Sequence, residues 1–246
     1  MVVKFSAANT KLKKLYQVES LKPYLEGKKK IYSFDLLSGW SCPAAKDCFS
    51  RAIQTAQGRR IQDGPDTQWR CFSASQEVVY TNVYNMRKRN FDTLRDCTNV
   101  NDMAVLINRA LPKNAGIVRI HVAGDFFNST YFKAWVKVAQ WNPYILFYAY
   151  TKQLKVWVEN ANIVPENLVL TASYGGRYDS MIQENDLRFA KVVENESQAE
   201  LMGVEVDNDD SHAADPNKRY ESFALVIHGT QPKGRKKLQP EMALWA

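Results

Sequence analysis

The sequence lacks the features that would assign it to a membrane or to an exported compartment. Its longest apolar run, Tyr144–Tyr150, has the length of a strand and is too short to cross a bilayer. The first residues, MVVKFSAANTKLKKLY, contain no apolar segment followed by a small-residue cleavage site. We therefore expect a soluble protein with no membrane partner, which works in a reducing cytoplasm.

Cysteine is also scarce, because a chain of 246 residues has only four. A reducing compartment disfavours structural disulfides, so thiols gathered in one half of a chain indicate a shared site. None of the four forms the closely spaced pair that is typical of structural zinc. They are Cys42, Cys48, Cys71 and Cys97, and none follows Cys97.

The positions of the thiols favour metal binding. Pro43 suits the first turn of a helix, so Cys42 would lie at a helix start, where the helix dipole stabilises a thiolate. Cys71 precedes a second predicted helix in the same way. Irregular spacing favours a [4Fe–4S] cluster held by all four cysteines over zinc, and such a cluster is able to serve in redox reactions. Four independent buried thiols remain the alternative.

Strands alternate with helices of about ten residues, which predicts an α/β fold with a mainly parallel sheet, as an open sheet or a partial barrel. We expect a single domain, 1–246, with a helical cysteine-bearing part, 1–115, and a βα part, 116–246. The expected helices are Pro43–Ala56, Ser73–Asn90, Asn99–Leu111, Thr130–Trp141 and Leu154–Glu159. The expected strands are Ile31–Leu36, Ile117–Ala123, Tyr144–Tyr150, Leu168–Ala172 and Phe223–Ile227. Residues 58–65 and 194–216 are expected to be irregular.

Polar residues follow the predicted strands, and ligands of parallel sheets bind at the carboxyl ends of strands. Gly124 and Asp125 end one strand and are candidate cofactor-binding residues. Alternation predicts that Arg119, His121 and Ala123 share a face, where the histidine is a ligand, a base or a satisfied core residue. Further strand ends carry Lys152 and Arg177, which would form a cationic mouth.

The net charge of +7 is compatible with nucleic acid or another polyanion as a partner. Solvated helix faces explain the same charge, and the acidic stretch 194–210 opposes it. Trp69 and Trp245 are candidates for stacking on unpaired bases. The basic segments are Lys11–Lys14, Lys28–Lys30, Arg59–Arg60, Arg87–Arg89 and Lys233–Lys237.

Several motifs, in order, resemble the phage gene-product-eighty-eight family. They are Ser41-Cys-Pro-Ala-Ala with Cys48, Cys71-Phe-Ser-Ala, Arg87–Asn90, His121-Val-Ala-Gly-Asp-Phe-Phe and Tyr150-Thr-Lys. The resemblance covers about residues 32–180 and implies a phage-encoded protein in the cytoplasm of an infected host, with an unknown redox or protein partner. That family has no well-established activity. The sequence departs from its pattern by a longer loop between Cys48 and Cys71 and by Phe72 in place of tyrosine.

The order of parts is also similar, more distantly, to that of radical S-adenosylmethionine enzymes. Those enzymes place three cluster cysteines after the first strand and a glycine-rich segment at the end of the second strand. Residues 37–48 and Gly124-Asp125 occupy comparable places, although the C-x3-C-x2-C signature is absent. Two alternatives therefore stand beside the four-cysteine protein: a radical enzyme whose cluster Cys97 does not bind, and a nucleic-acid-binding phage protein with a structural metal.

Overall fold

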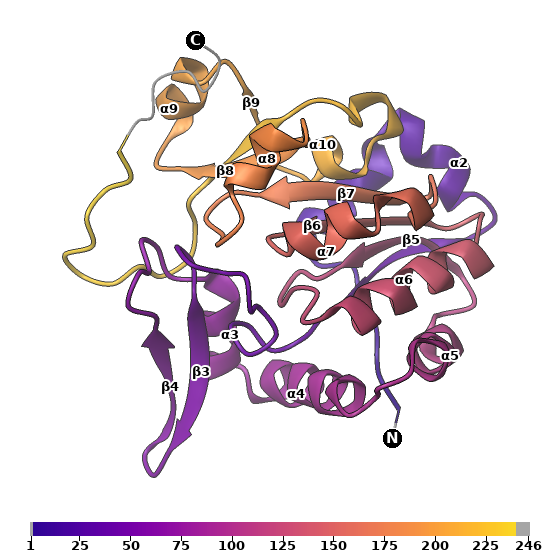
Figure 1. Ribbon diagram of the computed structural model, residues 1–246, viewed down its shortest axis with the longest axis horizontal. Helices are drawn as coiled ribbons and strands as arrows, with labels where there is room; N and C mark the ends of the chain where they lie inside the picture. Colours follow the sequence, from indigo (N-terminus) through magenta and orange to yellow (C-terminus); the bar gives the residue numbers. More distant parts are fainter. Residues whose placement is uncertain (1, 240–246) are drawn as a thin grey trace.

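The computed structural model describes residues 2–239, which contain an eight-stranded sheet (Figure 1). The strand order is β1-β2-β5-β6-β7-β8-β10-β9. β1 is antiparallel to β2 at one edge, and the other pairings are parallel, so the predicted α/β fold with a mainly parallel sheet is confirmed. The strands are β1 (Ser6–Ala7), β2 (Lys30–Phe34), β5 (Ala115–Ile120), β6 (Leu146–Thr151), β7 (Leu168–Ser173), β8 (Phe189–Val193), β9 (Glu205–Val206) and β10 (Phe223–Val226).

Helices connect the parallel strands, as crossovers between such strands require. Between β2 and β5 lie a hairpin, β3 (Ser50–Thr55) and β4 (Gly58–Asp63), and the helices α3 (Phe72–Val79), α4 (Thr81–Arg95) and α5 (Val100–Ala110). The later crossovers contain α6 (Ser129–Trp141), α7 (Leu154–Glu159), α8 (Ser180–Glu184) and α9 (Glu196–Leu201). Short helical turns complete the chain: α1 (Thr10–Lys13), η1 (Lys14–Gln17), η2 (Glu19–Leu21), α2 (Lys22–Leu25), η3 (Ala161–Ile163), α10 (Ser211–Ala214) and η4 (Pro216–Lys218).

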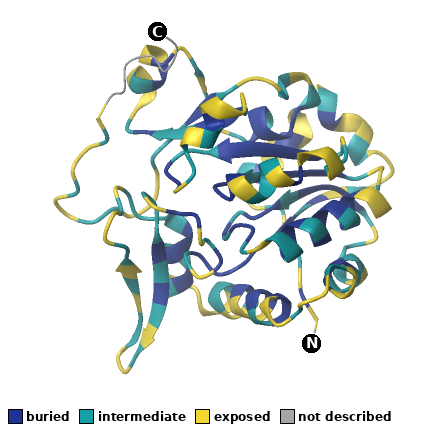
Figure 2. Cartoon of the chain, in the orientation of Figure 1, coloured by how far each residue is buried: buried dark blue, intermediate teal, exposed yellow. Residues whose placement is uncertain are grey.

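The sheet is covered on both faces, and its central strands are buried (Figure 2). On one face α4, α5 and α6 pack around Trp135, whose ring meets Phe34 edge-on at 5.3 Å between centroids. On the other face the N-terminal turns and α10 bury Leu12 and Leu15 against β5 and β6. β2 of the 1–115 part pairs with β5, so the two predicted parts share one sheet. None of the helices in residues 2–239 combines the length and the apolar character needed to cross a membrane.

The prediction of a helix over Pro43–Ala56 was wrong. Residues 50–55 form β3, which pairs with β4 in the segment that was expected to be a polar loop. The cause is tertiary packing: Ala52 is buried, and both strands lie against α3. The cysteine-bearing part is therefore not purely helical.

The predicted helix Ser73–Asn90 is two helices, because Tyr80 between them adopts an extended conformation (φ −105°, ψ 101°). The helix begins at Phe72, and the hydroxyl of Ser73 bonds to Val122 O at 3.3 Å rather than capping the helix. The segment 194–216 was expected to be irregular, but it contains α9, β9 and α10, and the sequence pattern also missed β8.

The predicted shared face of Arg119, His121 and Ala123 was also wrong. β5 ends at Ile120, and His121 has a φ of +69°, which breaks the alternation of side chains. Arg119 pairs with Asp210 on the face covered by the N-terminal turns. The His121 ring lies on the other face, with Nε2 2.9 Å from the Tyr131 hydroxyl, as a core histidine.

Candidate metal centre

The loop after β2 carries Cys42 and crosses the carboxyl end of β5. Leu36 N donates to Ala123 O at 2.9 Å, which ties the start of the loop to the chain that follows β5. Gly124 has a φ of +94°, and a β-carbon there would stand 2.6 Å from Ser41 Oγ. Only glycine allows this approach, so the candidate residue Gly124 packs directly against the neighbour of Cys42.

The next part of the loop is fixed to the carboxyl end of β7 by its backbone. Ala45 forms an isolated bridge with Gly176, and the N–H groups of Lys46 and Asp47 both donate to Gly175 O, at 3.1 and 3.0 Å. Gly175 also has a positive φ, and a β-carbon there would lie 2.7 Å from the Trp69 ring. The loop therefore spans the ends of three adjacent strands, with Cys42 and Cys48 on either side of this anchor.

Three of the predicted thiols share one electrostatic environment. Burial raises the pKa of the Cys42 thiol well above its ordinary value, and the charges of Asp125, Cys71 and Cys48 raise it further. Burial raises the pKa of the Cys48 thiol to about 11, and Cys71 contributes to that rise. Cys71 thus lies within electrostatic range of Cys42 and Cys48, although the three thiols do not form a compact group.

The buried Lys152 follows β6 and lies within electrostatic range of Cys48. Its charge lowers the pKa of Cys48 and so opposes the larger effect of burial. Lys152 Nζ donates to Ser173 Oγ at 2.7 Å, to Ser173 O at 3.2 Å and to Tyr174 O at 2.5 Å. The ends of β6 and β7 therefore lie together, as expected. Arg177 is exposed, and its backbone N–H donates to Ala44 O of the loop at 2.8 Å.

Asp125 is buried where it can join two strand ends. Its Oδ1 accepts from Thr151 Oγ1 at 2.6 Å and from Phe126 N at 2.7 Å, and its Oδ2 accepts from Lys152 N at 2.9 Å. Burial raises the pKa of Asp125 to about 6, against these hydrogen bonds. The carboxylate fixes the geometry around the thiols, and its role in binding a cofactor stays a prediction.

Cys97 lies apart from this group, between α4 and α5. Its Sγ is 3.4 Å from Thr93 O, and it packs against the core cluster on the helical face of the sheet. Burial raises the pKa of its thiol, with further contributions from Asp102 and Asp96 and from no other cysteine. The four predicted ligands are therefore not clustered: Cys71 lies within electrostatic range of Cys42 and Cys48, and Cys97 lies elsewhere. Within residues 2–239, no three His, Cys, Asp or Glu side chains form a group that could hold a metal ion.

The buried ion pair of Glu77 and Arg87 binds the start of the loop that carries Cys42, and the sequence analysis did not predict it. Glu77 Oε1 accepts from Ser38 N at 3.0 Å, Ser38 Oγ at 2.9 Å and Arg87 Nη1 at 3.1 Å. Arg87 was expected to belong to a basic surface, but it is 3% exposed. Asp35 has a similar role, since its Oδ1 accepts from Val122 N at 2.7 Å. A carboxylate directly after a buried strand was the signal that could have identified Asp35.

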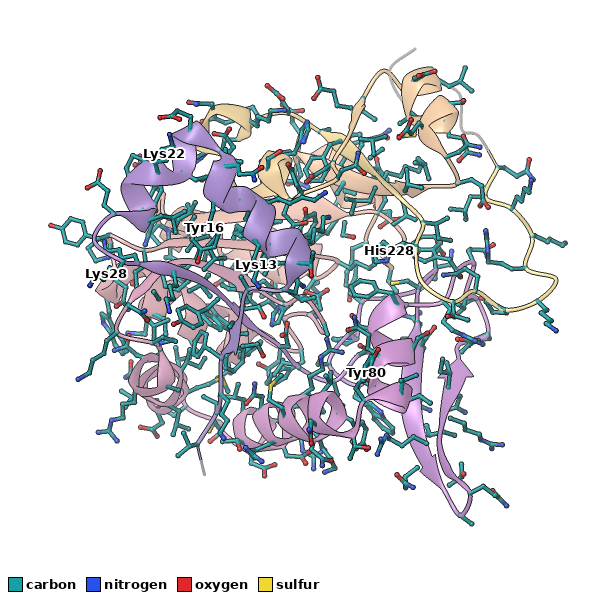
Figure 3. All side chains as sticks on the ribbon, turned by 180° about the vertical axis from the view of Figure 1, so that it is seen from behind. Lys13, Tyr16, Lys22, Lys28, Tyr80 and His228 are labelled. Atoms are coloured by element: carbon teal, nitrogen blue, oxygen red, sulfur yellow. The ribbon has the colours of Figure 1, made fainter. Side chains whose placement is uncertain are left out.

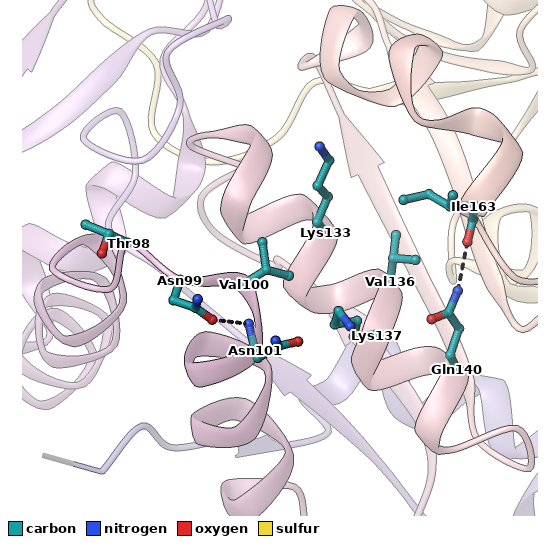
Figure 4. A pocket seen from close by; sticks show the side chains of 9 residues that line it. All are labelled: Thr98, Asn99, Val100, Asn101, Lys133, Val136, Lys137, Gln140 and Ile163. Carbon is teal, nitrogen blue, oxygen red and sulfur yellow. Dashed lines mark hydrogen bonds between the residues drawn. The ribbon is translucent and has the colours of Figure 1, made fainter.

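The open surface cavities formed by residues 2–239 include one beside α6 and one beside α3. The larger, of about 490 Å³, lies beside α5 and α6, away from the three thiols, and includes Lys133 and Lys137 (Figure 4). The smaller, of about 270 Å³, is lined by Phe72, Tyr80 and His228; Tyr80 and His228 are labelled in Figure 3. Because Phe72 follows Cys71 directly, this smaller cavity lies next to the thiol site.

The fold and the site define an α/β protein whose parallel sheet carries a thiol-bearing loop over the carboxyl ends of its strands. Residues 2–243 match the family described as Gene product 88, and the chain belongs to that family. The Gene 88 protein of Mycobacterium phage L5 is 32% identical over 91 residues, which are 33% of this chain and 38% of that protein. The chain thus matches less than half the length of this relative. No solved structure matches the chain significantly.

Proposed function

We propose that this phage-family protein binds a [4Fe–4S] cluster through three thiolates, those of Cys42, Cys48 and Cys71. One feature carries the proposal: the loop of Cys42 and Cys48 is bonded to Gly175, which packs against Trp69 of the segment that leads to Cys71. In agreement, Cys71 raises the pKa values of the Cys42 and Cys48 thiols, whereas the pKa of Cys97 is raised by burial and by two carboxylates. The four-thiolate arrangement expected from the sequence receives less support, because Cys97 lies between α4 and α5 and packs against the core.

The donor set fits a cluster better than it fits a single ion. A zinc ion holds each sulfur at about 2.3 Å, so its ligands must form a compact group. A cubane places its own irons and sulfides between the thiolates, so the ligating sulfurs do not need to touch. Bound iron would also compensate the burial that raises the pKa values of Cys42 and Cys48, since a coordinating thiol is deprotonated.

Three thiolates leave one iron of a cubane without a protein ligand. The position of the site supports S-adenosylmethionine as the small molecule that binds there, because the three cysteines follow the first parallel strand and Gly124 lies in the loop after the second. When both were bound, the cluster would supply an electron to the cofactor. The protein itself would contribute the positive charge of Lys152 near Cys48. Asp125 would contribute the hydrogen bonds that hold the loop after β5 against the end of β6.

Anaerobic purification followed by iron and sulfide analysis tests the cluster. We expect brown protein with about four irons and four sulfides per chain. Changing Cys42, Cys48 or Cys71 to alanine should remove most of the iron. Cys97→Ala is the matched control and should retain it. Colourless protein with stoichiometric zinc would exclude the cluster, and loss of iron from Cys97→Ala would restore the four-thiolate arrangement.

Electron paramagnetic resonance of the reduced protein tests the open iron. Adding S-adenosylmethionine should change the spectrum of the cluster, because a new ligand alters the electronic environment of the iron that it binds. An unchanged spectrum from a fully loaded, three-thiolate protein would exclude this cofactor and leave an electron-transfer role.

A further inference from the structure

The hairpin β3–β4 projects from the α3 side of the molecule, with its turn at the far end (Figure 1). Its strands pair in a regular antiparallel register that runs from Ser50 opposite Asp63 to Thr55 opposite Gly58. Gly58 has a φ of +111°, which lets the chain reverse after Ala56 and Gln57. The hairpin lies between Cys48 and Cys71, but its outer face belongs to neither the thiol site nor the core.

One face of the hairpin is fixed to the protein. Ala52 is buried against α3, and Arg59 lies on the same face of the hairpin. The Arg59 guanidinium donates to Glu77 O at 2.9 Å and to Thr81 Oγ1 at 2.7 Å, and it stacks 4.8 Å from the Tyr84 ring centroid. On the opposite face, Gly39 and Trp40 pack against Arg51 near the base, and Arg60, nearer the turn, is exposed.

The outer face carries arginine and glutamine. Alternation places Arg51, Arg60 and Gln62 there, since Arg51 is opposite Gln62 and Arg60 is opposite Ile53. Arg51 Nε donates to Gln62 Oε1 at 2.9 Å, and its guanidinium lies 4.4 Å from the centroid of the half-exposed Trp40 ring. Arg60 is exposed and makes no ion pair with any described residue.

No acidic side chain offsets this charge along the hairpin. Residues 50–62 contain no aspartate or glutamate. Asp63, at the base, is neutralised by Arg70, with Nη2 2.5 Å from Oδ2. Two arginines on a projecting ribbon, with no acidic residue to offset their charge, are complementary to a polyanion. They are less suited to a protein surface on which acidic and basic groups are mixed.

We propose that the outer face of β3–β4 binds double-stranded DNA in its major groove. That groove is about 12 Å wide and admits a two-stranded ribbon, and arginine and glutamine match the hydrogen-bonding edges of guanine and adenine. The deep, narrow major groove of double-stranded RNA excludes such a ribbon. The surface is independent of the proposed cluster, because none of its side chains belongs to the thiol site.

Fluorescence anisotropy with a labelled duplex, titrated at several salt concentrations, tests the proposal. The double variant Arg51→Ala/Arg60→Ala should raise the Kd at least about tenfold, because two base contacts are lost. The control Lys13→Ala/Lys28→Ala removes the same charge from residues remote from the hairpin (Figure 3) and should change the Kd about threefold at most. Both proteins should keep the iron content of the parent, which separates this result from any failure of the cluster proposal.

The single variant Arg60→Ala should fold as the parent does, because the Arg60 side chain is exposed and makes no ion pair within residues 2–239. It should weaken duplex binding about threefold or more without moving the thermal midpoint. Absence of salt-sensitive duplex binding overturns the proposal. Equal losses in the hairpin and control variants, or tighter binding of single-stranded DNA or double-stranded RNA, overturn it as well.

Discussion

Replacing Arg87 by methionine should destabilise the protein strongly, although arginine is among the residues most often found at surfaces. The side chains of Arg87 and Glu77 are 4% and 0% exposed, so water does not screen their charges. The guanidinium also donates to Ser73 O at 3.2 Å and to Gln76 Oε1 at 3.1 Å. Arg87→Met removes these bonds and leaves a buried carboxylate, which costs about 3–5 kcal/mol.

The same variant should show a defined pH dependence. Burial raises the pKa of Glu77 above its ordinary 4.5, and Arg87 opposes that rise, so the pKa increases further without the arginine. A carboxyl with a higher pKa in the folded state favours folding more as the pH falls. The loss of stability caused by Arg87→Met should therefore become smaller as the pH falls from neutral toward 4.5.

Chemical denaturation of the parent, Arg87→Met, Glu77→Gln and the double variant measures both effects. Ser38, which donates two hydrogen bonds to Glu77, belongs to the loop that carries Cys42. The single variants should therefore disturb this loop and also lose iron if the cluster is present. A double variant more stable than Arg87→Met would agree with the reasoning, because the unpaired charge is gone. A cost below about 1 kcal/mol for Arg87→Met at neutral pH would refute it, since that is the value of an exposed pair.

Two further changes test the strand ends. Burial lowers the pKa of His121 to about 3, so its neutral form contributes stability above pH 6.5 that is lost as the pH falls toward 3. The loss is at most about 5 kcal/mol, and His121→Asn should flatten the acid side of a stability profile measured by denaturation. Gly124→Ala would bring a β-carbon within 2.6 Å of Ser41 Oγ at a φ of +94°, which should cost about 2–3 kcal/mol. A thermal midpoint within a degree or so of the parent would contradict this reading of Gly124.

The sequence predicted β2, β5, β6, β7 and β10 and the helices α5, α6 and α7 because their patterns are local. α5 begins after Asn99, whose side chain accepts from Asn101 N at 2.7 Å, and α6 places its apolar stripe on the sheet. The hairpin was missed because residues 50–55 are also compatible with a helix, and their strand conformation depends on packing against α3. Arg51-Ala-Ile alternation followed by a turn at Gly58 was the available signal.

The candidate site was predictable only in part. Because cysteine is scarce, the sequence indicated all four thiols as candidate ligands. The position of Cys97 depends on how α4 and α5 pack, which the spacing of cysteines along the sequence does not encode. The break at His121 had no glycine or proline to signal it, since a histidine there has a φ of +69°. Buried partners such as Glu77 are indistinguishable in sequence from solvated charges on a helix.

The manner in which the cysteine loop is anchored bears on how such a protein can diverge. Lys46 and Asp47 reach Gly175 O through their N–H groups, and Ala45 meets Gly176 through the backbone. Because these bonds use no side-chain atom of the loop, mutations there can accumulate without releasing it. Selection should act instead on Gly175, where a β-carbon would strike Trp69 at 2.7 Å. In distant relatives the anchor is therefore better traced by that glycine than by the residues between the thiols.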